Sequence, residues 1–206
     1  LTIEDLASFW QAIAKEFSTF KNIYGYGLMN EPHDLAPETK WFDMAQASIN
    51  AIREVDTNTL IMVGGNDWSS AERWIEQSDT LKFLKDPANN LAFEAHVYFD
   101  KDASGTYKYS YEEEECYPEK GIDRVKPFVE WIKQNKFHGF IGEYGIPDND
   151  PRWNETLDLF LGYLQENGIN GTYWAAGPWW DSYFMAITPK DGKDRPQMPI
   201  IEKYTS

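Results

Sequence analysis

Apolar residues in the first part of the chain recur at steps of three and four, the spacing of one helix face. Thr2 stands where a helix cap is expected, so the pattern predicts a helix over residues 2–20. The same spacing predicts three more long helices, over residues 37–52, 122–132 and 151–167. Pro37 occupies the expected first turn of the second helix, where proline is tolerated. A further short helix is expected to begin at Ser69 or Ser70.

Between these helices lie segments that are apolar almost without interruption. Such runs, bounded by polar residues, are typical of strands buried on both faces. They predict five strands, over residues 23–31, 59–68, 90–100, 138–147 and 169–177. The stretch 101–118 is polar and rich in tyrosine, and it predicts a long loop whose four glutamates, residues 112–115, are a solvated surface.

Strands that alternate with helices predict an α/β fold with a parallel sheet. Two architectures fit this order: a doubly wound open sheet and a barrel. No glycine-rich phosphate-binding loop follows any strand, which disfavours a nucleotide-binding doubly wound fold. Instead the strands end in polar or aromatic residues, as in barrel enzymes, whose chemistry lies at the C-terminal ends of the strands. These residues are Glu31, Asp67, His96 with Tyr98, Glu143 and Trp174.

Composition narrows the possible ligands. The formal net charge of −15 would repel a phosphate backbone, so we expect no nucleic-acid partner. Aromatic residues make up 16% of the chain, and aromatic faces on an acidic protein favour uncharged ligands such as sugars. Part of this aromatic content is expected simply to fill the core.

The cysteine content and the absence of a long apolar run argue against a disulfide-rich fold and a membrane-spanning helix. Cys116 is the only cysteine, so no internal disulfide framework is expected. No run of 18 apolar residues occurs, so we expect no membrane partner. No signal peptide is visible, but the sequence opens with Leu1 and a helix cap, as if inside a fold.

Two of the strand-end residues are glutamates. Glu31 and Glu143 each follow apolar strand residues, where a charge is costly unless it is paired or used. In a parallel barrel both would lie at the same end of the barrel, and two facing carboxylates are the catalytic groups of most glycoside hydrolases. From spacing alone, two unrelated acids at strand ends are about equally compatible with the sequence.

Four segments resemble successive motifs of glycoside hydrolase family 5, and most closely its endo-β-1,4-glucanases: GLMNEPHD, HVYFDKDASGTY, IGEYG and TYWAAG, with GGNDW between the first two. They occur in the order of that family, each at a predicted strand end. The resemblance implies a (β/α)8 TIM barrel and retaining, endo-acting hydrolysis of β-1,4-glucan, without a cofactor or metal. It also implies a β-glucan polysaccharide as substrate and secretion from the cell.

The resemblance also implies roles for single residues. Glu31 would be the acid/base and Glu143 the nucleophile. Asn30 would contact the sugar 2-hydroxyl, and Trp174 would be the platform under the sugar ring, followed by a cis peptide bond. The other expected substrate-binding residues are His96, Tyr98, His33, Trp68, Trp179 and Trp180.

A complete barrel typically needs about 250 residues, and only five strands are predicted here. We therefore expect residues 1–206 to form a single partial catalytic domain, the last five β/α units, without the first three strands. An arginine and a histidine that the family places near its nucleophile would be missing with them. The chain is expected to need a complementary N-terminal barrel segment for activity.

Three alternatives remain open. The chain could be a non-catalytic carbohydrate-binding or structural fragment. It could act on mannan, xyloglucan or mixed-linkage glucan. A metal-dependent hydrolase using Glu31, His33, His96 and Glu143 is less favoured, because these residues lack a tight ligand spacing.

Overall fold

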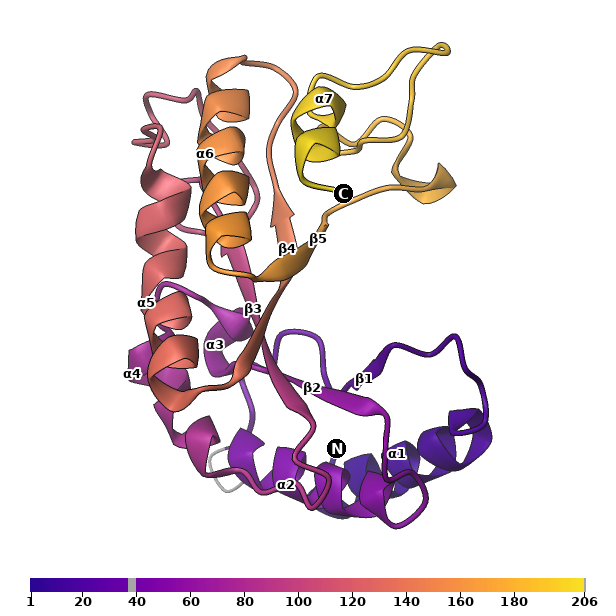
Figure 1. Cartoon of the computed structure of the whole chain (residues 1–206). Coiled ribbons are helices and arrows are strands. Elements are labelled where there is room, and N and C mark those ends of the chain that lie inside the picture. The colour runs from indigo at the N-terminus through magenta and orange to yellow at the C-terminus, as the bar shows by residue number, and fades with distance from the viewer. Residues whose placement is uncertain (37–39, 206) are drawn as a thin grey trace.

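The computed structural model describes residues 1–36 and 40–205. Strands and helices alternate along the chain, as the apolar pattern predicts (Figure 1). The strands are β1 (Gly25–Gly27), β2 (Leu60–Gly64), β3 (Leu91–Tyr98), β4 (His138–Gly145) and β5 (Asn170–Tyr173). The α-helices are α1 (Ile3–Phe17), α2 (Trp41–Arg53), α3 (Asn66–Ser69), α4 (Trp74–Ser78), α5 (Lys120–Asn135), α6 (Arg152–Glu166) and α7 (Met198–Ile201). Three 3-10 helices complete the described elements: η1 (Asp79–Phe83), η2 (Pro178–Trp180) and η3 (Glu202–Tyr204).

The five strands form one parallel sheet in the order β1-β2-β3-β4-β5. The sheet is curved, and α1, α2, α5 and α6 lie along its convex side (Figure 1). A doubly wound sheet would carry helices on both faces, whereas a barrel carries them only outside. The fold is therefore a curled half-barrel, and the prediction of a TIM-barrel architecture is confirmed.

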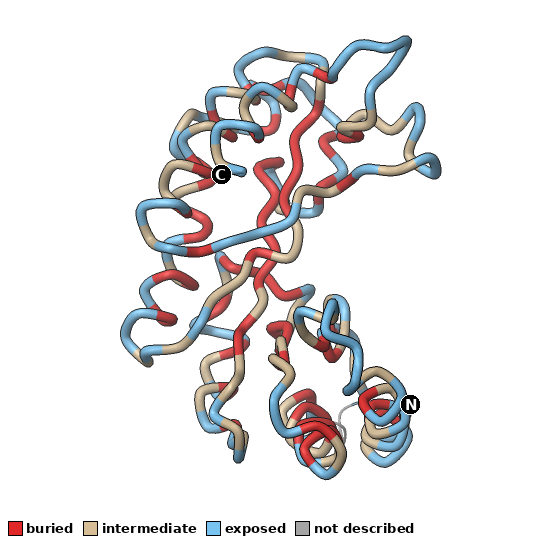
Figure 2. Tube along the Cα trace, turned by 45° about the vertical axis from the view of Figure 1, so that its right-hand side comes forward, coloured by how far each residue is buried: buried red, intermediate tan, exposed pale blue. Residues whose placement is uncertain are grey.

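Buried residues, red in Figure 2, follow the strands through the middle of the molecule and lie on the inner sides of the helices. Between the sheet and its outer helices, four aromatic rings pack edge to face with centroids 4.6–6.5 Å apart. They are Trp74, Phe93, Phe128 and Trp131, all almost completely buried. Edge-to-face packing adds directional contacts to the burial of large apolar surfaces. This cluster fixes α4 and α5 against β3, the strand that carries His96.

Indole donors tie the first two helices to strand ends. Nε1 of Trp10 in α1 donates to the carbonyl of Leu28, at 3.0 Å. Nε1 of Trp41 in α2 donates to the carbonyl of Gly64, at 2.7 Å. Both acceptors lie where a strand gives way to a loop, so these bonds set the positions of the loops that follow. No helix within the described residues is long and apolar enough to cross a bilayer.

Several predicted boundaries are wrong. β1 has only three residues, so Glu31 lies beyond the strand rather than at its end. No regular helix starts at Ser69 or Ser70: α3 contains left-handed backbone at Asp67 and Trp68, and the next regular helix is α4. The predicted helix start at Pro37 lies outside the described residues.

The long loop after β3 also differs from its prediction. Glu112, Glu113 and Glu115 are exposed, but Glu114 is 3% exposed. Its carboxylate accepts hydrogen bonds of 2.8 Å from the backbone amides of Lys101 and Tyr109. Glu114 therefore organises the loop by satisfying amides that would otherwise be buried without a partner.

Candidate active site

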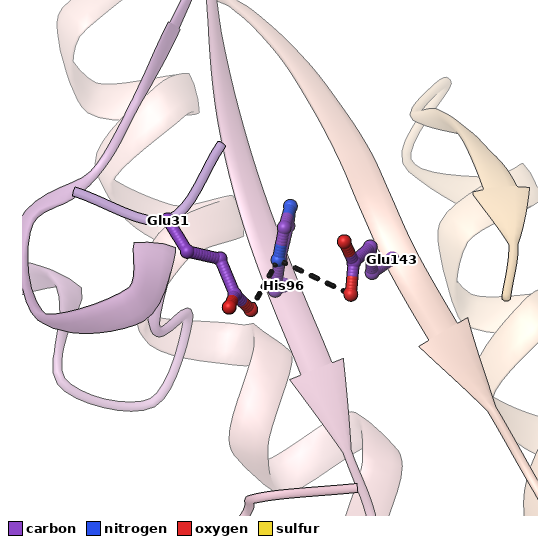
Figure 3. A group of neighbouring side chains, drawn as sticks. All are labelled: Glu31, His96 and Glu143. Atoms are coloured by element: carbon purple, nitrogen blue, oxygen red, sulfur yellow. Dashed lines mark hydrogen bonds and ion pairs between the residues drawn. The ribbon is translucent and has the colours of Figure 1, made fainter. Parts of the chain in front are cut away.

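Three side chains from separate parts of the sheet converge in Figure 3: Glu31 from the loop after β1, His96 from β3 and Glu143 from β4. Nδ1 of His96 lies 2.8 Å from Oε1 of Glu31 and 3.7 Å from Oε2 of Glu143. One carboxylate oxygen of each glutamate lies within 4.8 Å of the other. The parallel sheet thus brings together two acids that are 112 positions apart in sequence.

Glu31 is held by the loop that follows β1. Its φ of 46° lies in the left-handed region, which non-glycine residues seldom adopt. The loop passes close to Gly64, where a Cβ would lie 3.0 Å from the carbonyl oxygen of Met29 and 3.5 Å from Pro32. Glycine at position 64 therefore permits the approach that carries Glu31 to the carboxyl end of the sheet.

Glu143 owes its position to an irregularity between β3 and β4. Glu94 pairs with Phe140 and Ala95 with Ile141, but His96 pairs with Glu143. Gly142 is therefore an extra residue, a bulge in β4. A bulge re-aims the side chains that follow it, and here it sets Glu143 beside His96.

Tyr98 completes this arrangement from the end of β3. Its hydroxyl donates a 2.7 Å hydrogen bond to Oε2 of Glu143. Burial raises the pKa of Glu143, while the charge of His96 and the hydrogen bond from Tyr98 partly oppose that rise. Burial and the adjacent Glu143 charge also raise the pKa of Tyr98 well above its usual range, so Tyr98 remains a donor.

His96 is 5% exposed and lies among carboxylates. Burial favours the neutral ring, but hydrogen bonds to Glu31 and Glu94 and the charge of Glu143 outweigh it and raise the pKa of His96 to about 9. At neutral pH the imidazolium therefore carries a positive charge between Glu31 and Glu143.

A cleft of about 400 Å³ opens beside this cluster. Glu31, His96 and Tyr98 line one part of it, and Trp68 and Arg73 line another. The predicted ligand-binding residue Trp68 stacks on His33, which lines a second, adjoining pocket, with ring centroids 4.4 Å apart. Both are exposed, as is Asn30 beside Glu31. Stacked aromatic surface next to carboxylates suits a ligand with flat apolar faces and hydroxyl groups.

Trp174 follows β5, and its amide donates to the carbonyl of Tyr144 in β4, at 2.8 Å. The peptide bond from Trp174 to Ala175 is cis, as predicted. The half-buried Trp174 ring packs edge to face on Trp180, with centroids 4.9 Å apart. Trp179 instead is 89% exposed.

Glu31, His96 and Glu143 are the group within residues 1–36 and 40–205 that could offer three ligands to a metal. His33, the fourth residue of the metal hypothesis, instead contacts Asp34 and Trp68. Both ring nitrogens of His96 already lie within hydrogen-bond distance of carboxylates. Ordinary hydrogen bonding therefore accounts for this cluster, and the arrangement favours acid/base chemistry.

Sequence reasoning missed Glu94 and Tyr107. Glu94 lies on the same face of β3 as His96 and Tyr98, a relationship that the two-residue period of a strand could have revealed. Tyr107 joins the ends of β3 and β4: its hydroxyl accepts from the Phe99 amide at 2.9 Å and donates to the Gly145 carbonyl at 2.6 Å. Tyr107 is the last residue of the motif HVYFDKDASGTY, but its letters alone do not show that it bridges two strands.

Comparison with known proteins gives a consistent result. The model of the family "Cellulase (glycosyl hydrolase family 5)" matches residues 2–179. Endo-beta-1,4-glucanase B of Emericella nidulans is 36% identical over 193 residues, which are 91% of this chain and 56% of that protein.

Solved structures agree in both fold and sequence. Endoglucanase Cel5A of Pseudomonas stutzeri, in complex with cellobiose, matches this chain with a TM-score of 0.93 and 42% sequence identity. The match covers 100% of this chain and 61% of the Pseudomonas stutzeri chain. XacCel5A in complex with cellopentaose matches with a TM-score of 0.89 and 38% sequence identity. That match covers 100% of this chain and 66% of the XacCel5A chain. This chain thus spans about three fifths of the length of these relatives. On this evidence the chain belongs to glycosyl hydrolase family 5, the cellulase family.

Proposed function

We propose that the chain carries the two catalytic glutamates of a retaining, endo-acting β-1,4-glucanase. The observation that carries the proposal is the approach of Glu31 and Glu143, whose nearest carboxylate oxygens lie within 4.8 Å. Retaining glycosidases have carboxyl groups about 5–5.5 Å apart, whereas inverting enzymes leave about 6.5–9.5 Å for a water molecule. The short separation supports double displacement.

In this mechanism a carboxylate oxygen of Glu143 attacks the anomeric carbon and the bond to the leaving oxygen breaks. Glu31 gives its proton to that oxygen, so a glycosyl ester of Glu143 and a free sugar hydroxyl result. Glu31, now a carboxylate, takes a proton from water, whose oxygen attacks the same carbon and releases Glu143. The hydrogen bond from Tyr98 and the charge of His96 favour the ionised nucleophile that the first step needs.

The remaining residues have proposed roles in binding glucan. Asn30 would contact the 2-hydroxyl, His96 and Tyr98 would line the cleavage subsite, and Trp174 would stack under the sugar at that subsite. A second group would extend the contact surface: His33, Trp68, Trp179 and Trp180. The relatives whose solved complexes hold cellobiose and cellopentaose support a β-1,4-glucan as the first substrate to test.

We further propose that residues 1–206 are one partial catalytic domain, whose barrel is closed by a complementary N-terminal segment, and that the enzyme is secreted. Within the described residues, β1 and β5 are the two edges of the sheet, each paired on one side only. Unpaired edges of this kind are normally covered in folded proteins. The relatives, longer than this chain, support the same proposal.

The test compares the chain alone with the chain joined to a complementary N-terminal barrel segment that supplies the first three strands. The joined protein is expected to cleave soluble cellulose and cello-oligosaccharides, and the first product seen by proton NMR is expected to be the β-anomer. Glu143→Gln should abolish turnover, whereas Glu130→Gln, an exposed change on α5, should leave it intact. An α-anomer as first product would contradict the retaining mechanism. Cleavage of mannan or xyloglucan that is faster than cleavage of soluble cellulose would contradict β-1,4-glucan as the substrate.

A further inference from the structure

Glu94 is an acid that the proposed reaction does not use. It lies in β3 on the face that carries His96 and Tyr98, and its side chain is only 18% exposed. Its Oε1 lies 3.2 Å from Nε2 of His96. Among the described residues, His96 is the hydrogen-bonding partner of this carboxylate. A partly buried charge with one partner is expected to constrain that partner strongly.

Gly142 provides the space for this carboxylate. A Cβ at position 142 would lie 2.1 Å from Oε1 of Glu94 and 2.7 Å from its Cδ, which is closer than any real contact. Because Gly142 is also the bulged residue of β4, the same irregularity has two effects. It aligns Glu143 with His96, and it leaves the volume that Glu94 occupies.

The imidazole of His96 is consequently fixed from both sides. Nε2 faces Glu94, and Nδ1 faces Glu31 and Glu143. If the ring turned over, carbon atoms would face the carboxylates and both nitrogens would lose their partners. A carboxylate on one ring nitrogen commonly orients a histidine so that the other nitrogen can serve the site.

We propose that Glu94 is a positioning residue, which occupies the space left by Gly142 and holds His96 so that Nδ1–H points at Glu31 and Glu143. The positive charge of His96 then lies between the proposed acid/base and nucleophile. The catalytic consequence rests on the proposed function, but the orientation and charge of His96 do not. Glu94 acts through His96 and does not itself touch the substrate.

The direct test is the titration of His96 by imidazole ¹⁵N NMR in the 206-residue chain. The sequence contains three histidines, so the His96 signal can be assigned by its loss in His96→Asn. Three carboxylates face this ring, from the loop after β1, from β3 and from β4: Glu31, Glu94 and Glu143. Glu94→Gln keeps the shape of the side chain and removes one of these charges. We expect it to lower the pKa of His96 by about one unit or more.

Gly142→Ala tests the same relationship without removing the acid, because the added methyl group must displace the Glu94 carboxylate. Like Glu94→Gln, it is expected to lower the pKa of His96. Gly27→Ala is the matched control: its Cβ would lie 3.9 Å from Oε2 of Glu94, an ordinary contact. Glu130→Gln controls for loss of a distant exposed charge. An unchanged His96 titration in folded Glu94→Gln would overturn the proposal.

In the joined enzyme, Glu94→Gln should lower kcat about tenfold or more, change KM little and shift the pH profile. If Glu94→Gln had the same kcat and the same pH profile as the unsubstituted enzyme, the positioning role would be contradicted. The His96 titration tests the role of Glu94, and the kinetic assay tests the proposed glucanase function, so the two proposals can fail separately. A shifted His96 titration in a joined protein without glucanase activity would sustain the role of Glu94 and reject the proposed function.

Discussion

The hydroxyl of Tyr98, at the end of β3, donates a 2.7 Å hydrogen bond to Oε2 of Glu143 in β4, although 45 positions separate the two residues. Tyr98 is 7% exposed, so this bond is largely shielded from water. Its position is also defined from the loop that follows: a Cβ at Gly105, where φ is +73°, would lie 2.9 Å from the Tyr98 ring. The proposed nucleophile is thus held by a donor that is itself held by close packing.

Tyr98→Phe should therefore impair the joined enzyme without unfolding it. A hydrogen bond to a charged group contributes about 1.5–3 kcal/mol, which corresponds to a loss of about 10–100-fold in kcat/KM. The bond also lowers the pKa of Glu143 against the effect of burial, so its removal should move the acidic limb of the pH profile to higher pH. A pH series of kcat/KM measures both effects. Tyr117→Phe, which removes an exposed hydrogen bond to Asp123, should change neither.

The charge of His96 should make stability depend on pH. Its pKa is raised from 6.5 to about 9 in the folded chain, so the folded state binds the proton more tightly than the unfolded state. The resulting stabilisation is fully present below pH 6.5 and is lost as pH rises through 9. It amounts to about 3 kcal/mol at most, since one pKa unit corresponds to 1.36 kcal/mol.

Urea unfolding at pH 6 and pH 9.5 measures this loss. His96→Asn should remove most of the pH dependence in that window, whereas the exposed His138→Asn should retain it. A free energy of unfolding that is equal at both pH values in the unmodified chain would contradict the assigned charge.

The tryptophans after β5 should differ in their importance for binding. Trp174 is half buried and packed against Trp180, so its face is fixed, whereas Trp179 is almost fully exposed. Trp174→Ala should reduce kcat/KM on cello-oligosaccharides by about 100-fold, because stacking on an ordered ring loses little entropy on binding. Trp179→Ala should cost less than about fivefold. Similar effects of the two substitutions would argue against Trp174 as the platform.

Gly145 should be intolerant of a side chain because of its contact with the segment that carries Trp174. A Cβ at Gly145 would lie 2.5 Å from the backbone oxygen of Trp174 and 3.1 Å from Sδ of Met185. Backbone cannot yield as a flexible side chain can, so Gly145→Ala should destabilise the chain by about 1–3 kcal/mol and weaken glucan binding. Thermal unfolding and oligosaccharide titration test this.

Gly162→Ala is the matched control. Gly162 lies within α6, and its Cβ would meet only the hydroxyl of Tyr204 at 3.5 Å. Alanine is favoured over glycine inside a helix by about 1 kcal/mol. This substitution should therefore be neutral or stabilising, and a loss as large as that of Gly145→Ala would refute the contact argument.

The sequence alone determined the order of elements and the parallel sheet, and it indicated Glu31 and Glu143 as candidate catalytic acids. These follow from short-range patterns, because a strand buried on both faces needs an uninterrupted apolar run. The acids stand out because a charge next to such a run requires a partner or a use. The ordered motifs from Gly27 to Gly177 then predicted the family, and the match over residues 2–179 confirms it.

Only the tertiary structure decided how the acids meet and what surrounds them. The left-handed backbone at Glu31, the bulge at Gly142 and the burial of Glu114 have no local periodic signal. Each depends on groups distant in sequence: Gly64 beside the first loop, Glu94 beside the bulge, and backbone amides 5 and 13 positions from Glu114. Sequence patterns report which face of an element is apolar. They do not report which distant neighbour fills a space or satisfies a charge, and those contacts define the chemistry of this site.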